Sequence, residues 1–371
     1  MESKDQLKSI ESISSALDSS FENIASIIQT DIGNRGIRNI LPPNNFQHFQ
    51  KAAESLLDSQ NVAILSGFAC IMDSEPHYET DGLAGAFAIA KCLLNLNKKV
   101  TLLFDLHSET YMREIIRDYF SNLNANVQLN LTSLFLETCS QGLSEDSLLK
   151  LKELSEKSDC IVSIERPSVT VTGQYLTMRA FDISHLSSPF DQYLFPLVGQ
   201  PKKNLNQVLI SIGDGGNEVG MGSVQQLVKQ HINNGEKIAA NTYCDHLLVT
   251  DTSNFGGYAL VYCIIAEILK LKIQEKEDHE GVVHKLFPEY MQAILKDMRN
   301  INDFKEFLLT NHGITLSNER QCAKLLEKHQ IKDGITKLVG DTVDGISFED
   351  QAIIIHNMQK VIQDIDFNTL E

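Results

Sequence analysis

The sequence predicts an α/β fold: a mostly parallel sheet flanked by helices, in a Rossmann-like layered architecture with extra helices at the C-terminal end. Two observations support this class. Apolar runs of strand length alternate with longer segments whose apolar residues recur at helical spacing, which is the rhythm of βαβ units. Most of these runs are followed directly by polar, acidic or glycine-rich residues, as expected where parallel strands end at a binding site.

The N-terminal segment is expected to be an amphipathic helix over residues 7–29, because apolar residues recur there on one helical face. The sequence identifies no partner for this apolar stripe, which is expected to contact either the core or a second copy of the chain. We therefore expect a homo-oligomer, at least a dimer. A turn with two glycines follows at 31–37, Pro42 and Pro43 end any extended segment, and a second helix is expected over 46–58.

The first half of the sheet is expected from apolar runs separated by helices. Residues 61–68 form a buried strand that leads into a small-residue turn, and the small, apolar residues of 83–94 suit a helix packed closely on the sheet. A second strand is expected at 99–104. The helix predicted over 108–122 and the apolar run near 127–131 continue the alternation.

The second half of the sheet repeats the pattern. A helix over 146–157 leads to an apolar, β-branched strand at 160–164. The run 207–212 is the strand before a glycine-rich loop, and helical spacing follows this loop at 224–229. A last strand is expected at 246–250, because its apolar residues run into another polar, glycine-containing turn.

The C-terminal part is expected to be mainly helical. Apolar spacing predicts a helix over 259–271, and the charged, apolar-poor stretch after it is typical of an exposed connection. Further helices are expected near 289–310, 317–329 and 349–363.

Composition excludes several classes of function. The net charge of −17 argues against binding to nucleic acids or to anionic membranes, both of which need a basic surface. The seven cysteines form no Cys-x-x-Cys pair, so neither a zinc ribbon nor a disulfide framework is supported and a reducing compartment is expected. The N-terminus has no apolar signal region and carries more acid than a transit peptide tolerates, and no apolar run reaches about 18 residues. We therefore expect a cytoplasmic protein without a membrane span.

The most informative stretch is the loop 213–222, in which glycines are interleaved with Asp214, Asn217 and Glu218. Such a loop either cradles an anion with backbone N–H groups or holds a hard cation with carboxylates. The two acids favour the cation, with Asn217 as an uncharged ligand. The spacing fits neither the phosphate-binding loop with its Lys nor the dinucleotide-binding loop, because Glu218 stands where the third glycine belongs. The alternative is a glycine-rich turn whose acids are solvated or cap the next helix.

A second group of acids precedes the helix at 83–94. Glu75, Glu79 and Asp81 lie within seven residues. Asp81, like Thr80, has an alternative role as the N-cap of that helix. Two like charges about 4 Å apart repel by roughly 4 kcal/mol at an effective dielectric constant near 20, and a bound cation would turn that repulsion into affinity. We therefore expect Glu79 and Asp81 to take part in metal binding or acid–base chemistry.

Candidate anion-binding residues are scattered along the chain. Asn34 and Arg35, in a turn, either reach an anion or lie on the surface. Glu165 and Arg166 can neutralise each other, although an Arg at a strand end is also a carboxylate clamp. Arg179 lies on a segment expected to lead from a loop into a helix, and it has few apolar neighbours in the sequence.

Six short motifs occur in order along the chain: DIGNRGI at 31–37, ETDG at 79–82, SIERP at 163–167, GDGGNEVGMG at 213–222, SNFGGYAL at 253–260 and VDGIS at 343–347. Together they resemble the D-glutamate cyclase family. The resemblance is dense over about residues 30–270 and sparse in the tail, and the long glycine–acid motif is its most specific part. The chain departs from the family at Phe255, where relatives tend to have Trp, and at Pro167 and Ser168, where Ala-Gly is commoner.

The resemblance implies an α/β enzyme of the cytosol or of mitochondria, a hydro-lyase that closes D-glutamate to 5-oxo-D-proline with loss of water. Archaeal relatives are reported to carry manganese, so the resemblance also implies a divalent metal ion, Mn²⁺ with Mg²⁺ as the alternative. The chain is then one D-glutamate cyclase-like domain, 1–371, with an N-terminal helix (1–30), a catalytic core (30–270) and a mainly helical C-terminal part (271–371).

Ring closure needs an unprotonated amine, an electrophilic γ-carboxylate and a stabilised leaving oxide, which a divalent ion and a positioned carboxylate can supply. Catalytic and metal-binding roles are therefore expected for Glu79, Asp81, Asp214 and Glu218, with Asn217 as a further metal ligand. Substrate binding is expected from Arg166, Arg179, Asn254, Asn34 and Arg35. The division of the acids between metal ligand and base stays open.

Two other functions stay open as well. A manganese-dependent phosphatase acting on a small metabolite would use the same acids. A non-catalytic, metabolite-binding homologue is the third hypothesis, supported only by the altered sequence after Arg166. In the cyclase hypothesis the expected partner is a small anionic amino acid, whose negative charge requires local cations in so acidic a protein.

Overall fold

The central sheet is parallel throughout. The computed structural model describes residues 4–139, 142–274, 281–295, 298 and 300–368. Within these residues six strands follow the order β3-β2-β1-β6-β7-β8, and each neighbouring pair is parallel. The predicted α/β class is therefore confirmed. The strands are β1 (Asn61–Ser66), β2 (Lys99–Asp105), β3 (Leu131–Leu136), β6 (Cys160–Ile164), β7 (Val208–Gly213) and β8 (His246–Val249). A short antiparallel ladder joins β4 (Thr138–Cys139) and β5 (Gly142–Leu143).

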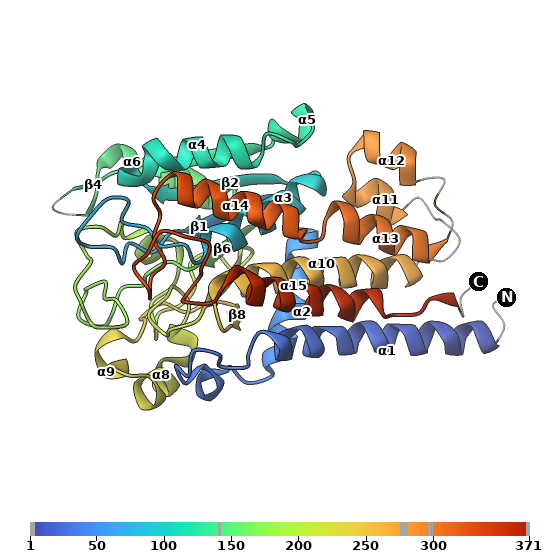
Figure 1. Cartoon of the computed structure of the whole chain (residues 1–371), viewed down its shortest axis with the longest axis horizontal. Coiled ribbons are helices and arrows are strands. Elements are labelled where there is room, and N and C mark those ends of the chain that lie inside the picture. Colours follow the sequence, from blue (N-terminus) through green and yellow to red (C-terminus); the bar gives the residue numbers. More distant parts are fainter. Residues whose placement is uncertain (1–3, 140–141, 275–280, 296–297, 299, 369–371) are drawn as a thin grey trace.

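Helices cover both faces of the sheet (Figure 1). They are α1 (Lys4–Ile27), α2 (Asn45–Asp58), α3 (Leu83–Asn95), α4 (Glu109–Tyr119), α5 (Ala125–Gln128), α6 (Glu145–Lys157), α7 (Phe190–Leu194), α8 (Gln225–His231), α9 (Gly235–Ile238) and α10 (Ser253–Gln274). The C-terminal part adds α11 (Gly281–Leu286), α12 (Glu289–Leu295), α13 (Ile301–Asn311), α14 (Leu316–Lys328) and α15 (Phe348–Gln363).

Alternation along the strands produces two cores. Ile64 of β1 joins a large core with α1, α2, α3, α10 and α15, whereas its neighbour Leu65 joins a second core with α6, α7 and α8 on the opposite face. Successive strand side chains point to opposite faces, so a strand buried on both faces reads as a continuous apolar run. This explains why the strand segments were recognisable in the sequence.

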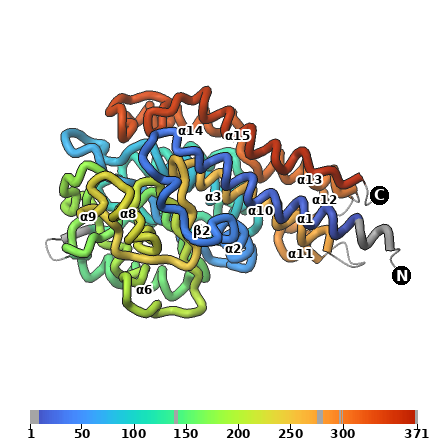
Figure 2. The backbone as a smooth tube through the Cα atoms, turned by 90° about the horizontal axis from the view of Figure 1, so that it is seen from below, coloured from blue at the N-terminus to red at the C-terminus, as the bar shows by residue number. Residues whose placement is uncertain are grey.

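The N-terminal helix is part of the main core. Its apolar residues Ile13, Leu17, Phe21 and Ile24 are buried. Helix α1 packs against α10 and α15, and Figure 2 shows α1 and α15 running side by side away from α8 and α9. The apolar stripe is therefore covered by the chain itself and does not require a second copy. The homo-oligomer stays a prediction.

The largest differences from the predicted boundaries occur at three places. The strand expected near 127–131 begins at Leu131, and Val127 lies in α5 instead. Helix α10 begins at Ser253, six residues before the predicted start, because an acid from another part of the chain accepts its first N–H groups. The helix expected near 289–310 is divided into α12 and α13, and the Asn300 side chain caps the start of α13.

Chain order reverses in the middle of the sheet. From β1 the chain proceeds outward to β2 and β3, and from β6 it proceeds outward in the other direction to β7 and β8. The carboxyl ends of β1 and β6 therefore flank a topological switch point, where open α/β sheets bind ligands. Among the helices that the structure describes, none is both long enough and apolar enough to cross a membrane.

Candidate active site

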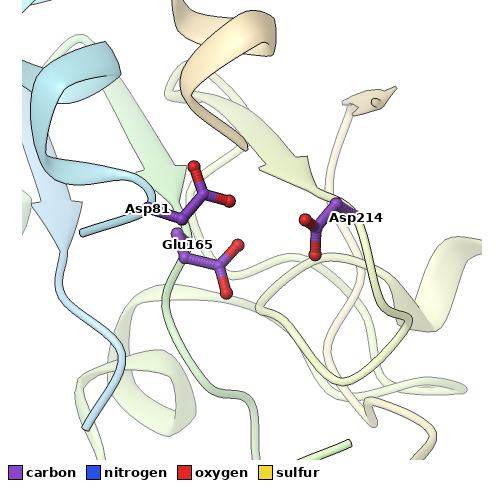
Figure 3. A group of neighbouring side chains, drawn as sticks. All are labelled: Asp81, Glu165 and Asp214. Carbon is purple, nitrogen blue, oxygen red and sulfur yellow. The ribbon is translucent and has the colours of Figure 1, made fainter. Parts of the chain in front are cut away.

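Three carboxylates converge at the switch point (Figure 3). Asp81 lies in the loop between β1 and α3, Glu165 directly follows β6, and Asp214 directly follows β7. All three are buried, and one oxygen of each lies within 4.8 Å of the others. Asp81 and Asp214 were predicted as site residues. Glu165 was considered only as one of two alternatives, as a residue that neutralises Arg166, and it was not among the predicted site residues, so its place in this group is an addition.

The backbone around Glu165 is specialised. Glu165 has φ 42°, a left-handed conformation that is uncommon for residues other than glycine, Asn and Asp. Gly82 lies so close that a Cβ atom there would be 2.2 Å from Cβ of Glu165. The Ser253 hydroxyl donates a hydrogen bond of 2.6 Å to the Glu165 carboxylate. A strained, tightly packed acid at a strand end is a common feature of functional sites.

Asp81 holds two helices together. Its carboxylate accepts N–H groups of Gly82, Ser253 and Asn254, each at 2.8 Å. The N-cap of α3 is Gly82, without a capping side chain, so the role considered for Asp81 at α3 is wrong, and Asp81 caps the start of α10 instead. Burial, with repulsion from Asp344, raises the pKa of Asp81 to about 7 despite these hydrogen bonds.

Asp214 is balanced by a single guanidinium. Nη2 of Arg35 lies 2.7 Å from Asp214, and Nη1 of Arg35 lies 2.9 Å from Asp344. Burial nonetheless raises the pKa of Asp214 to about 7, because Arg35 opposes this effect only in part and Asp81 adds repulsion. Burial and the nearby Asp214 carboxylate raise the pKa of Asp344 well above its usual range. Arg35, expected to bind substrate, is engaged by the acids of the site itself.

The glycine-rich loop folds around its own acid. Both oxygens of the Glu218 carboxylate accept backbone N–H groups, from Gly215 at 2.9 Å and from Gly216 at 2.8 Å. A Cβ atom on Gly215 would lie 2.8 Å from Oε1 of Glu218, so the backbone of the loop closely approaches this carboxylate. These N–H groups are therefore not directed at an external anion. Burial raises the pKa of Glu218, and its hydrogen bonds to the loop backbone counteract that rise.

Two further residues, Glu79 and Asn217, belong to the same site. Glu79 is buried, and a Cβ atom on Gly334 would lie 1.5 Å from its Oε2. Burial, together with repulsion from Asp344 and Asp81, raises the pKa of Glu79 well above its usual range. Asn217 donates from Nδ2 to the Leu176 carbonyl at 2.8 Å, whereas its buried Oδ1 has no partner among the described residues.

Most of the residues of this site, although not Asp81, line a cavity of about 490 Å³. Its acidic end carries Glu79, Glu165, Asp214, Asn217, Glu218 and Asp344, with Arg35. Apolar side chains, including Phe68, Met178 and Phe181, form part of its wall, and Arg179, Lys332 and Lys337 also line it. Of the lining residues, Asp344 and both lysines come from the segment between α14 and α15. Their only signal in the sequence was the VDGIS motif, which marks Asp344.

The Arg166 side chain lies outside the cavity lining. Its guanidinium is buried and forms an ion pair with Asp105, with a hydrogen bond of 2.9 Å from Nη2 to Oδ1. Burial alone would raise the pKa of Asp105, but the adjacent Arg166 guanidinium lowers it to about 2. Arg166 is not among the residues that line the cavity. Its placement therefore differs from the substrate-binding position expected for it.

The two predicted asparagines also lie outside the cavity lining. Asn34 is exposed on the turn after α1. Asn254 is buried: its Oδ1 accepts the Gly85 N–H at 2.8 Å and its Nδ2 donates to the Thr80 carbonyl at 3.3 Å. Asn254 thus joins α10 to α3 in this structure. Of the five predicted substrate-binding residues, Arg35 and Arg179 line the cavity.

The acidic end fits a hard divalent cation. Asp81, Glu165 and Asp214 offer three carboxylate oxygens close together, and the unpartnered Oδ1 of Asn217 lines the same cavity. Oxygen donors of this kind are those that Mg²⁺ and Mn²⁺ prefer. Relative to the predicted ligand set, Glu165 is added, and Glu218 is not part of the group of described acids whose carboxylate oxygens lie within 4.8 Å of one another.

Two comparisons with known proteins identify sequences related to this chain. A family model described as D-glutamate cyclase-like, C-terminal, matches residues 24–359. Human mitochondrial D-glutamate cyclase is 29% identical over 326 residues, which are 88% of this chain and 49% of the human protein. The chain thus spans about half the length of that curated relative.

Proposed function

The chain belongs to the D-glutamate cyclase-like family, and from this premise we propose that it closes D-glutamate to 5-oxo-D-proline with loss of water. The name of the human relative supports the reaction. The observation that carries the proposal is the group of buried carboxyls at the switch point, whose pKa values are raised to about 7 at Asp81 and Asp214. Buried groups with such raised pKa values are concentrated at functional sites.

Ring closure requires the transfer of protons away from the amine and onto the departing oxygen. The amine nitrogen forms a bond to the carbon of the γ-carboxylate, and the bond from that carbon to one of its two oxygens breaks. Two protons leave the ammonium nitrogen, and two protons reach the departing oxygen, which leaves as water. The site must therefore contain a group that accepts protons and a group that donates them.

Two acids of the cavity suit these roles. The Glu218 carboxylate accepts two backbone N–H bonds that stabilise its ionised form, and it is the proposed proton acceptor for the substrate ammonium. Glu79, whose pKa burial raises well above the usual range, is the proposed proton donor to the departing oxygen. Both side chains line the same cavity.

Asp81, Glu165 and Asp214 are the proposed ligands of a divalent ion, Mn²⁺ or Mg²⁺, with Asn217 as an uncharged ligand. When bound, such an ion supplies Lewis-acid polarisation of the γ-carboxylate. The cavity itself holds the substrate amine and the γ-carboxylate together, which contributes the proximity that ring closure needs. A location in the cytoplasm, with the mitochondrial matrix as the alternative, is proposed with this activity.

The test is product formation. Purified protein is incubated with D-glutamate or L-glutamate, in EDTA or in millimolar Mn²⁺ or Mg²⁺, and 5-oxoproline is resolved by chiral chromatography. We expect 5-oxo-D-proline from D-glutamate, and at least a hundredfold loss of turnover in Glu79→Gln, as is usual when an acid–base group is removed. Glu22→Gln, an exposed change on α1, is the matched control. No 5-oxoproline from either enantiomer by folded protein would overturn the proposal.

A further inference from the structure

Three cationic side chains that line the cavity form no ion pair with the described acids of the site. Arg35 is paired with Asp214 and Asp344. Arg179, Lys332 and Lys337 line the same cavity, and no carboxylate of the described residues lies within ion-pair distance of any of them. The chain has a net charge of −17, so an anionic ligand depends on cationic side chains of this kind. Their charge is available to a ligand.

The two lysines are held by neutral groups. Nζ of Lys332 donates to the Ser74 hydroxyl at 2.8 Å. Nζ of Lys337 lies 3.5 Å from the carbonyl oxygen and the sulfur of Cys70. These partners orient the ammonium groups without cancelling their charge, and each ammonium has further donor capacity.

The backbone that carries the lysines is fixed to the active-site loop. The Lys332 carbonyl accepts the Thr80 N–H at 3.1 Å, beside Glu79 and Asp81. The buried Asp333 carboxylate accepts N–H groups of Ile335 at 2.7 Å and of Gly345 at 2.8 Å. The segment 332–345 is therefore a built part of the site, and the lysines have defined positions relative to the acids.

The other groups that could hold an anion are already engaged. The N–H groups of Gly215 and Gly216 bind Glu218. The Arg166 guanidinium binds Asp105, and Arg35 binds the acids of the site. An anionic substrate that enters this cavity thus meets its available positive charge at Arg179, Lys332 and Lys337.

We propose that Lys332 and Lys337, assisted by Arg179, bind the α-carboxylate of an amino-dicarboxylate substrate, the carboxylate that does not react. The amine and the γ-carboxylate are then directed to the acidic end of the cavity. This assignment rests on the proposed function and specifies how the site selects its substrate. It gives to two lysines of the C-terminal part the role that the sequence suggested for Arg166.

The test compares D-glutamate with its α-amide, D-isoglutamine, which lacks only the charge of the α-carboxylate. Turnover is measured by product chromatography and binding by calorimetry, in wild type, Lys332→Met and Lys337→Met. The wild type should prefer D-glutamate, and each variant should lose about tenfold of that preference, mainly through KM or Kd, because a charge-assisted hydrogen bond to the spectator group is lost. Lys324→Met, an exposed lysine of α14 outside the cavity lining, is the control for net charge.

The outcomes separate this inference from the cyclase proposal. An unchanged preference in both lysine variants overturns the inference while leaving the cyclase activity intact. If the wild type forms no 5-oxoproline, calorimetry still decides: D-glutamate binding that weakens about tenfold in the variants supports the subsite, and no binding of D-glutamate overturns it. Tighter binding of inorganic phosphate than of D-glutamate, lost in the same variants, would also overturn the carboxylate assignment.

Discussion

Two groups of buried charges lie at the same edge of the sheet, and they are built in opposite ways. Asp105, at the end of β2, is matched by the Arg166 guanidinium, and this ion pair lowers the pKa of Asp105 to about 2. Asp81, Glu165 and Asp214 lie together, and Arg35 pairs with only one of them, Asp214. Burial raises the pKa of Asp81 and Asp214 to about 7. In a balanced buried pair the removal of one partner is costly, because the other charge is left uncompensated. A group of acids without enough cations is suited to binding a metal ion or to exchanging protons.

The largest expected effect comes from breaking the balanced pair. Arg166→Met leaves the Asp105 carboxylate buried without its cation, which should lower the free energy of unfolding by about 3–5 kcal/mol. Urea denaturation measures the loss. Arg179→Met, at an exposed residue of the cavity, is the matched control and should change stability by less than about 0.5 kcal/mol. A similar small effect for both variants would show that the two regions do not differ in this way.

The pH dependence of stability should have opposite signs in the two regions. The pKa of Asp81 rises from 3.8 to about 7 on folding, so its contribution to stability is present at low pH and is lost as the pH rises through this interval. The pKa of Asp105 falls from 3.8 to about 2, so its contribution is present above 3.8 and is lost as the pH falls toward 2.

Urea titrations between pH 4.5 and 8 in EDTA check this sign. Asp81→Asn should reduce the decline of unfolding free energy with rising pH, by on the order of 1 kcal/mol per pH unit for one proton. The slope is the readout, because the substitution also disturbs the hydrogen bonds of Asp81 to α10. Parallel profiles for wild type and Asp81→Asn would mean that Asp81 titrates normally in the folded protein.

The sequence predicted the fold better than the site, and the reason is physical. Strands buried on both faces appear as apolar runs, and helices show their own period, so local pattern was enough for both. The start of α10 was missed because its cap, Asp81, is 172 positions away. No local pattern encodes a capping group that tertiary structure supplies.

Prediction of the site residues from the sequence was limited in the same way. Asp81 and Asp214 were recognisable because each follows a strand within an acid- or glycine-rich motif. Glu165 was not predicted as a site residue, because pairing with the adjacent Arg166 was one of the roles that the sequence left open. In the structure the strained backbone at Glu165 accompanies different partners for the two side chains. Lys332 and Asp344 come from the tail, where the resemblance to the family was sparse. Long-range pairing decides these roles, and a single sequence does not reveal it.

The most direct test of the central claim is the response of both regions to a metal ion. Thermal and urea unfolding at pH 8, in EDTA and in Mn²⁺ at a hundredfold excess over its Kd, should show about 2.7 kcal/mol of metal-dependent stabilisation in the wild type. Glu165→Gln should be at least as stable as wild type in EDTA and should lose most of that increment. Asp105→Asn should be less stable in EDTA and should keep it. Metal-independent curves for wild type and Glu165→Gln alike would contradict the account, because the unbalanced acids would then not be a cation site.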